Sequence, residues 1–211
     1  MNILGLKTTK QWIKYWSNRK LTFDEYAISD WNHPHRYVIS AILKNIPFIS
    51  LMDIGCKNGA NLMNILKTLG NKQIGGVDVN KNNVELLEKR FRGGVFKKNT
   101  GDDIMLSDKA VDIVLSDMSL IYVGPTKIKK YLREFKRIGR NYVLLCELHS
   151  DNPWERLWLR LTKGIYIYNY KKILKSMGFY GILTHKLRPE EWQGLPHTKY
   201  AYIFLAKIPK Y

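Results

Sequence analysis

The stretch from residue 53 to residue 59 combines an acid, Asp53, with two glycines directly after an apolar run. Residues 48–52 carry no charge, which predicts a strand covered on both faces, and residues 60–69 have apolar side chains at helical spacing. Gly55 and Gly59 therefore fall in the turn between a strand and a helix. Glycine there lets the backbone turn sharply and approach a ligand closely, beside the free N–H groups of a helix start. The turn is thus a candidate binding site.

The spacing of these glycines excludes two phosphate-binding loops. A dinucleotide fingerprint has glycine at its first, third and sixth positions, but the third position here is Lys57 and the sixth is Ala60. A Walker loop requires Gly-Lys-Ser/Thr after the strand, and that sequence is absent. The turn therefore suits a different ligand.

The stretch Asp-Ile-Gly-Cys-Lys-Asn-Gly at residues 53–59 resembles the first motif of class I S-adenosylmethionine-dependent methyltransferases, acid-x-Gly-x-Gly-x-Gly. The resemblance implies S-adenosylmethionine as the cofactor. The loop backbone would pack against its methionine part, with Asp53 steadying the loop or meeting the amino group through water. Lys57 replaces the middle glycine, where a positive φ would cost a side chain roughly 1–2 kcal/mol. The implied cofactor contacts in this stretch are Asp53, Gly55, Cys56, Lys57, Gly59 and Asn61.

A second acid supports the resemblance. Residues 73–78 read as the next strand, and Asp78 at its end lies about 20 residues beyond the turn, the distance that places a carboxylate over a ribose. A carboxylate can accept hydrogen bonds from both ribose hydroxyls at once. The family uses this acid in that way, which implies that Val79 also lies at the cofactor. The alternative is that Asp78 only caps the helix that begins near Asn80.

The loop after the third predicted strand, residues 95–97, is the next candidate contact. In the family this loop places an acid or a small polar group near the adenine amino group, and Thr100, Gly101 and Asp102 occupy that place here. A turn followed by a helix cap explains the same residues. By the same analogy Arg36, in the segment before the first strand, meets the cofactor carboxylate.

The end of the fourth predicted strand, residues 111–116, separates the substrate classes. Enzymes of the family that methylate exocyclic amines of bases carry a small polar residue, two prolines and an aromatic there, and those prolines are absent. Cytosine-C5 methylation needs a cysteine after a proline, and neither Cys56 nor Cys146 follows one. Asp117 fits the Lys-Asp-Lys-Glu pattern of ribose 2′-hydroxyl methylation, but Glu147 stands where the second lysine belongs.

Residues 54–62, 115–125 and 137–145 resemble better the methyltransferases found with bacterial surface-polysaccharide and sugar-modification pathways. That group shares an Ile-Gly-Cys-Asn-x-Gly-x-Asn-Leu first motif, a Val-Leu-Ile-His/Tyr-Ile-x-Pro run and an Arg-x-x-x-x-Tyr-Val/Ile-Leu strand. The resemblance covers roughly residues 48–147. It implies a sugar or another small polar acceptor, methylated on oxygen.

Several side chains are candidates to face that acceptor. Residues 142–146 read as the fifth strand. Strand ends line the ligand crevice in open α/β sheets, which predicts that His149, Glu147 and Asp117 share one rim. His149 is the preferred general base, because the unperturbed pKa of histidine is about 6.5; a surface histidine in a loop is the alternative. Methyl transfer from a sulfonium can also run on positioning without a base. The candidates are His33, His35, Asp117, Tyr122 and His149.

The 211 residues carry 35 Lys and Arg against 18 Asp and Glu, which gives a net charge of +17. This charge attracts nucleic acid, acidic lipid headgroups and nucleotide sugars without selecting among them, and compositional bias is the alternative explanation. Two cysteines predict a reduced compartment and no metal site. No signal peptide or transmembrane run is visible, so we expect a cytoplasmic protein, with peripheral contact at the inner face of the membrane as a further option.

The resemblance implies one α/β domain over residues 1–211, a doubly wound Rossmann-like sheet of seven strands in the order 3-2-1-4-5-7-6 with the last strand antiparallel. Residues 1–47 would form an N-terminal helical cover, 48–147 the cofactor-binding core and 171–211 a C-terminal helix and antiparallel hairpin. Residues 149–170 read as an inserted helix that is a lid over the acceptor, a membrane-surface contact or outer core. Its apolar residues at helical spacing are Trp154, Leu157, Trp158 and Leu161.

The sequence thus predicts an S-adenosylmethionine-dependent methyltransferase that acts on oxygen of a sugar, a glycan precursor or another small polar molecule. Two alternatives stay open. One is an RNA methyltransferase that uses the basic surface, whose RNA affinity would depend on salt. The other is a non-catalytic cofactor-binding or membrane-associated module. Nothing in the sequence selects an oligomeric state.

Overall fold

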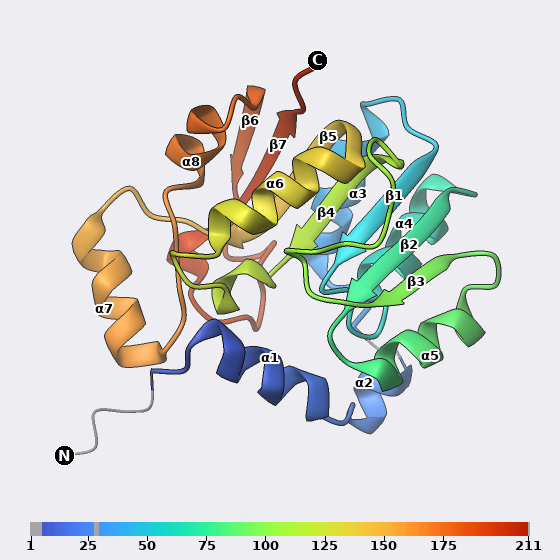
Figure 1. The fold of residues 1–211 in the computed structure, drawn as a ribbon, viewed down its shortest axis with the longest axis horizontal. Coiled ribbons are helices and arrows are strands. Elements are labelled where there is room, and N and C mark those ends of the chain that lie inside the picture. The colour runs from blue at the N-terminus through green and yellow to red at the C-terminus, as the bar shows by residue number, and fades with distance from the viewer. Residues whose placement is uncertain (1–5, 28–29, 211) are drawn as a thin grey trace.

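Seven strands form one sheet in the order β3-β2-β1-β4-β5-β7-β6 in the computed structural model, which describes residues 6–27 and 30–210 (Figure 1). β7 runs antiparallel to β5 and β6, and the other neighbours are parallel. The predicted strand order and the antiparallel strand are confirmed. The strands are β1 (Ser50–Ile54), β2 (Gln73–Asp78), β3 (Val95–Lys98), β4 (Val111–Asp117), β5 (Gly139–Leu148), β6 (Tyr180–Lys186) and β7 (Ala201–Lys207).

Helices join the strands close to where the hydrophobic periodicity predicts them. β5 begins earlier than the expected residue 142, because Gly139 already pairs with Val111 of β4. Within the described residues, none of the helices is long and apolar enough to cross a bilayer. The helices are α1 (Thr9–Asn18), α2 (Phe23–Ala27), α3 (Pro34–Lys44), α4 (Ala60–Leu69), α5 (Lys81–Arg90), α6 (Ile128–Ile138), α7 (Pro153–Lys163) and α8 (Tyr170–Ser176), with 3-10 turns at Leu120–Tyr122 and Thr198–Tyr200.

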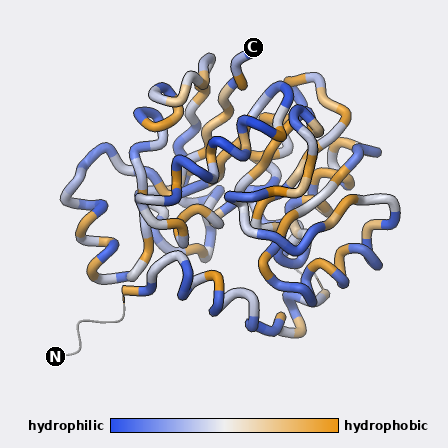
Figure 2. Tube along the Cα trace, viewed as in Figure 1, coloured by the Kyte–Doolittle hydropathy of each residue, from blue (hydrophilic) through white to orange (hydrophobic). Residues whose placement is uncertain are grey.

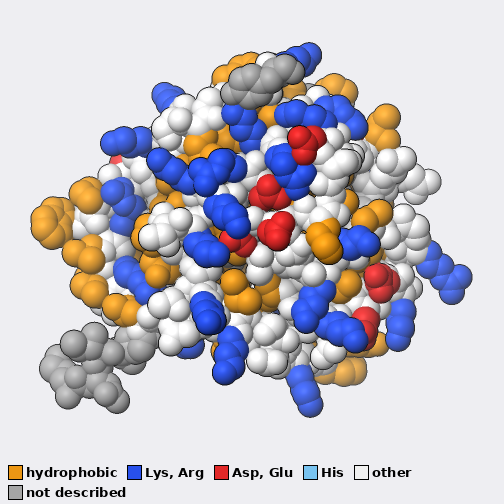
Figure 3. Space-filling view, viewed as in Figure 1, with side chains coloured by type: hydrophobic (Ala, Val, Ile, Leu, Met, Phe, Trp, Pro, Cys, Tyr) orange, Lys and Arg blue, Asp and Glu red, His pale blue; other side chains and the backbone are white. Residues whose placement is uncertain are grey.

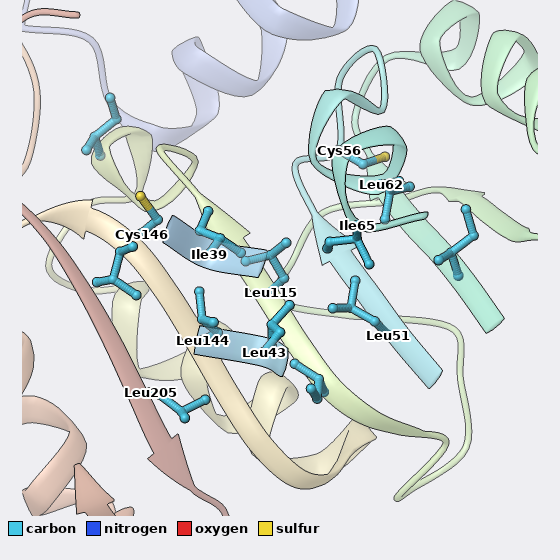
Figure 4. Packing of buried hydrophobic residues seen from close by; sticks show 14 of the residues in the cluster. Ile39, Leu43, Leu51, Cys56, Leu62, Ile65, Leu115, Leu144, Cys146 and Leu205 are labelled. Carbon is cyan, nitrogen blue, oxygen red and sulfur yellow. The ribbon is translucent and has the colours of Figure 1, made fainter. Parts of the chain in front are cut away.

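The helices cover the two faces of the sheet, each over its own apolar cluster. The strands between them are apolar along most of their length, as expected for strands buried on both faces (Figure 2). α6 and α8 cover one face, where Leu132, Phe135 and Leu174 are fully buried. On the other face, helices α3 and α4 pack on β1, β4, β5 and β7 through a cluster that includes Ile39, Leu43, Leu62, Ile65, Leu51, Leu115, Leu144 and Leu205 (Figure 4).

α1 lies across the carboxyl ends of the parallel strands (Figure 1). Its first turn is fixed to the loop after β4, where the Gly124 N–H donates to Thr9 Oγ1 at 2.8 Å. Its last turn is fixed to the loop after β2, where the Asn80 amide donates to the carbonyls of Trp16 at 3.0 Å and Arg19 at 2.6 Å. The helix is therefore held at both ends over the edge of the sheet where ligands bind in open α/β folds.

Candidate active site

A cavity of about 440 Å³ lies under α1, at the carboxyl ends of β1, β2 and β4. Gly55, Asp78 and Asp117, at or just beyond the ends of these strands, all line it. The tryptophans of α1 close one side, and the loop around Trp192 closes another. The volume lies within the range of small-molecule sites, roughly 300–1,000 Å³. The cavity is therefore the candidate active site.

The turn after β1 needs its glycines. Gly55 has φ +85° and Gly59 has φ +82°, in the left-handed region that disfavours side chains. A Cβ at Gly55 would lie 2.5 Å from Ser119 Cβ, and one at Gly59 would lie 2.6 Å from Leu87 Cδ2. Both positions therefore exclude a side chain by conformation and by space.

Lys57 adopts a positive φ as well, at +47°. The strain considered for this substituted glycine position is thus present in the loop, at a cost of roughly 1–2 kcal/mol. An ion pair offsets part of it, because Lys57 Nζ lies 2.5 Å from Glu25 Oε1 in α2. Glu25 also accepts two hydrogen bonds from the guanidinium of Arg19, at 2.9 and 3.0 Å. The helical cover and the glycine turn are therefore joined through these three charges.

We expect Gly55→Ala to weaken cofactor binding at least tenfold and to lower the free energy of unfolding by about 2–4 kcal/mol, from strain and overpacking against Ser119. Gly93→Ala is the matched control, because Gly93 has the same φ of +85° and nothing within 4 Å of an added Cβ. Thermal unfolding and calorimetric titration with S-adenosylhomocysteine measure both effects. Equal losses in the two variants would show that the contact with Ser119 is unimportant.

Asp78 lines the cavity, and its carboxylate can accept a further hydrogen bond. Its Oδ2 accepts the Lys57 N–H at 2.9 Å, and its Oδ1 accepts the Asn80 N–H at 2.8 Å and the Asn83 amide at 3.2 Å. Burial raises the pKa of this carboxyl above its usual value. Asn83 Oδ1 is buried without a partner among the described residues and belongs to a residue that also lines the cavity. The N-cap of α5 is Asn80, whose side chain accepts the Asn82 N–H, so Asp78 holds the turn before the helix rather than capping it, and it also offers an acceptor to a ligand.

The loop after β3 contributes fewer contacts than expected. Gly101 lines the cavity, but Thr100 and Asp102 do not. Thr100 Oγ1 donates to Asp102 Oδ1 at 2.7 Å, and Asp102 Oδ2 pairs with Lys127 at 2.9 Å, so both side chains are engaged away from the ligand space. The expectation that they contact adenine is corrected accordingly. Asn99, which was not predicted, takes their place in the wall as the first residue after β3.

Four predicted cofactor contacts lie beneath the glycine turn and do not line the cavity. Asp53 is buried and accepts the Asn61 amide at 3.3 Å. Burial and the neighbouring Asp117 charge raise the pKa of Asp53 to about 7. Cys56 faces β2, because a Cβ at Gly76 would lie 2.5 Å from its Sγ. The glycine turn is therefore shaped by four residues that do not line the cavity, Asp53, Cys56, Gly59 and Asn61. Their side chains are not placed to contact the cofactor directly.

The far end of the cavity holds a chain of hydrogen bonds between two histidines and an acid. His35 Nε2 lies 2.9 Å from Asp117 Oδ2, and His35 Nδ1 lies 2.5 Å from His33 Nδ1. His33 Nε2 lies 2.6 Å from the carbonyl oxygen of Gln193. α3 positions the histidines, since His33 is its N-cap and Pro34 begins the helix. The predicted cluster of imidazoles thus meets the end of β4.

The partners in this chain assign its protons. The Gln193 carbonyl can only accept, so His33 Nε2 carries hydrogen and His33 Nδ1 accepts from His35. His35 then carries hydrogen on both ring nitrogens and pairs with the Asp117 carboxylate. Burial alone would raise the pKa of Asp117, but the charge and hydrogen bond of His35 lower it to about 2. Asp117 Oδ1 is buried without a hydrogen-bond partner among the described residues, and the Cys146 thiol lies beside the carboxyl group.

A family profile described as "Methyltransferase domain" matches residues 51–141, the segment that contains the glycine turn, Asp78 and Asp117. Residues 51–141 are therefore those of a methyltransferase domain, and the fold is that of class I S-adenosylmethionine-dependent methyltransferases. No curated protein matches the sequence.

Solved structures of low sequence identity share the fold of this methyltransferase. A chain from the complex of the Haloferax volcanii Trm112 methyltransferase activator with a methyltransferase is 16% identical, with a TM-score of 0.65 over 88% of this chain and 94% of that one. A SAM-dependent methyltransferase from Aquifex aeolicus is 18% identical, with a TM-score of 0.60 over 89% and 100%. Magnesium protoporphyrin IX methyltransferase from Synechocystis PCC 6803, solved with bound SAM, is 16% identical, with a TM-score of 0.60 over 94% and 89%.

The cavity of the methyltransferase fits S-adenosylmethionine at the positions that carry unused polar atoms. Asp78 Oδ2 and Asn83 Oδ1 offer acceptors to ribose hydroxyls. Arg36 lines the cavity, its Nη2 lies 3.2 Å from Asp30, and its buried Nε has no partner among the described residues, which suits a carboxylate. Val79 and Gly101 offer apolar and backbone surface for adenine. These residues would hold the cofactor.

His149 does not face the cavity of the methyltransferase, which corrects its assignment as the general base. The last pair between β5 and β7 is Leu148 with Ala201, and one further hydrogen bond follows it, from the His149 N–H to the Tyr200 carbonyl at 2.7 Å. The imidazole is 4% exposed, packs on Tyr202 and Phe204, and accepts the Tyr170 N–H at 3.1 Å through Nδ1. Burial lowers the pKa of His149. The residue therefore has a structural role.

Glu147 is also buried rather than at the rim. Its Oε1 accepts from the Ser119 N–H at 3.0 Å, the Leu120 N–H at 3.0 Å and the Ser116 hydroxyl at 2.9 Å. Burial raises the pKa of this carboxyl to about 8. Glu147 thus holds the turn after β4 against Gly55, and of the expected rim only Asp117 reaches the cavity.

Aromatic rings form another part of the cavity wall. Trp12 and Trp16 of α1 pack on Tyr122, with ring centroids 4.7 and 5.2 Å apart. The indole N–H groups of both tryptophans are buried without a partner among the described residues. Burial raises the pKa of Tyr122 to about 12, so the phenol is neutral and is a hydrogen-bonding group rather than a base. The wall combines apolar area with free donors.

Proposed function

We propose that the protein transfers the methyl group of S-adenosylmethionine to a hydroxyl of a small, sugar-like acceptor. The observation that carries the proposal is that one cavity has two chemically different ends. One end offers Asp78, Asn83 and Gly101 to the cofactor. The other offers the unpartnered Asp117 Oδ1 beside a fixed pair of imidazoles.

When bound, S-adenosylmethionine supplies an electrophilic methyl carbon on a sulfonium. Asp117 Oδ1 accepts the hydrogen bond of the acceptor hydroxyl and orients its lone pair toward that carbon. With the cofactor bound, Asp117 Oδ1 would also take up the proton that the acceptor hydroxyl loses on methylation. A carboxylate of low pKa is a weak base, so most of the rate comes from positioning by Asp117, His35 and His33.

The aromatic wall supports a sugar-like acceptor over other small molecules. Sugars present apolar C–H faces and hydroxyl edges at once, and the tilted rings of Trp12, Trp16 and Tyr122 offer an apolar surface with two unpaired indole donors. The motif resemblance of residues 54–62 and 115–125 to methyltransferases of sugar modification points the same way.

Methyl transfer should fail in acid well before the Asp117 carboxylate titrates, because the pKa of Asp117 is about 2. Burial lowers the pKa of His33 below 6.5. As the pH falls through that pKa, protonated His33 Nδ1 can no longer accept from His35 and the chain to Asp117 opens. We expect kcat/KM to be level from neutral pH down to about 6.5 and to fall below it. A fall that begins above 6.5 would contradict this role for neutral His33.

The test is incubation with methyl-labelled S-adenosylmethionine and an acceptor panel of free sugars, nucleotide sugars and RNA. We expect S-adenosylhomocysteine release together with a sugar product heavier by one CH₂. Labelled RNA instead of labelled sugar would overturn the acceptor class and leave the cofactor assignment intact. Lys and Arg side chains lie scattered over the face shown in Figure 3, without the continuous basic groove that RNA binding favours.

A further inference from the structure

Helix α7 presents an apolar stripe to solvent. Trp154, Leu157, Trp158 and Leu161 are 74%, 48%, 54% and 50% exposed, and their spacing places them on one face. Figure 3 shows hydrophobic side chains gathered at the left edge of the molecule, over the position of α7 in Figure 1. No α7 residue lines the cavity, so the stripe is not a lid over the acceptor.

The helix that carries the stripe is fixed in place. The segment containing α7 leaves and returns at one point, where His149 and Tyr168 form a bridge and the Ser150 N–H donates to the Tyr168 carbonyl. Leu159, on the opposite side of α7, is fully buried. Arg160 donates to the carbonyls of Gly164 at 2.7 Å and Lys7 at 3.0 Å, which joins the helix to the start of α1. These contacts of Leu159 and Arg160 therefore hold α7 with its apolar stripe facing solvent.

The surroundings of the stripe are basic. α7 carries Arg156, Arg160 and Lys163, and its one acid, Glu155, lies 2.5 Å from Lys199 Nζ. Burial and the charge of nearby Lys163 lower the pKa of His197. A helix with tryptophan and leucine on one face and arginine and lysine on the others is typical of a segment that lies in a membrane interface.

We propose that α7 docks the protein on an anionic lipid surface, with the stripe inserted at the level of the headgroups. The net charge of the chain distinguishes the two partners that could cover such a stripe, a second copy of the chain and a lipid surface. Two copies of a chain with a net charge of +17 repel each other, whereas anionic headgroups attract it by about 1 kcal/mol for each Lys or Arg near the surface. Tryptophan side chains favour this interface because one edge is apolar and the other donates a hydrogen bond.

Co-sedimentation with vesicles tests the proposal. We expect the full-length protein to bind vesicles of phosphatidylcholine with phosphatidylglycerol, to bind phosphatidylcholine alone at least tenfold more weakly, and to be released by salt. Trp154→Ser with Trp158→Ser should reduce binding at least tenfold. The matched control is Ile49→Ser with Met105→Ser, which removes two apolar side chains that are 68% and 66% exposed elsewhere on the surface. The control should bind like the wild type.

Two results would overturn the proposal. One is equal vesicle binding by the stripe variant and the control, which would leave the net charge as the whole cause. The other is a wild-type dimer in sedimentation velocity that the stripe variant abolishes, which would make a second copy the occupant. Because all four substituted side chains are exposed, unchanged thermal unfolding is expected in both variants and shows that the comparison is between folded proteins.

Discussion

Asp78→Ala should weaken S-adenosylhomocysteine binding roughly a hundredfold, about 3 kcal/mol. The substitution removes the acceptor that Asp78 Oδ2 turns to the cavity and the anchor for the Lys57 N–H. It also leaves the Asn80 N–H without its partner at the start of α5. Loss of a ribose contact and loosening of the glycine turn therefore act in the same direction.

Calorimetric titration measures this effect, and two further variants isolate its cause. Asp78→Asn keeps one oxygen for a backbone N–H but places an NH₂ group where the other acceptor stood, so its affinity should fall between those of the wild type and the alanine variant. Asp103→Ala removes the same charge from an exposed position in the next loop and should bind like the wild type. Unchanged affinity in a folded Asp78→Ala protein would remove Asp78 from the cofactor site.

Asp117→Asn should lower kcat by about a hundredfold to a thousandfold while changing S-adenosylhomocysteine affinity only a few-fold. The amide keeps the shape of the side chain but ends the ion pair with His35 and reduces the basicity of the oxygen that faces the acceptor. The measurement uses the sugar acceptor identified in the panel, with the rate of product formation followed under saturating S-adenosylmethionine.

A double-mutant cycle with His35→Gln separates catalysis from general damage. If His35 and Asp117 act as one unit, the double variant should be no slower than the slower single variant. Rate losses that multiply would show that the two residues act independently, against the chain of hydrogen bonds in the structure. Thermal unfolding of each variant checks the fold, because removing one member of a buried ion pair can destabilise by several kcal/mol.

The parts of the site that lie along one segment could be predicted from sequence. Gly55 and Asp78 follow from local patterns, since a buried strand, a glycine turn and an acid at the next strand end mark a ligand site, whereas the strand order was implied by the family resemblance. Asn99 was not predicted as a cavity residue, because a single polar residue after a strand belongs to no motif of characteristic spacing. A rule that every first residue beyond a parallel strand is a cavity candidate would have found it.

Contacts between distant segments could not be predicted. His35 and Asp117 were separate candidates, but they are 82 residues apart, and their hydrogen bond depends on how α3 packs against β4. His149 was assigned to the rim because β5 was expected to end at Cys146. The strand instead continues to Leu148 with β7 beside it, which buries the imidazole. Strand length and edge coverage are set by tertiary pairing rather than by local propensity.

The bond between His33 Nε2 and the Gln193 carbonyl joins residues 160 positions apart. A ribosome adds roughly 5–20 residues each second, so this bond cannot form until at least 8–32 seconds after His33 has been made. Residues 51–141 are complete well before then. During synthesis the half of the site that suits the cofactor can therefore assemble before the half that suits the acceptor. A chain stopped short of Gln193 should retain more of its affinity for S-adenosylhomocysteine than of its rate of methyl transfer.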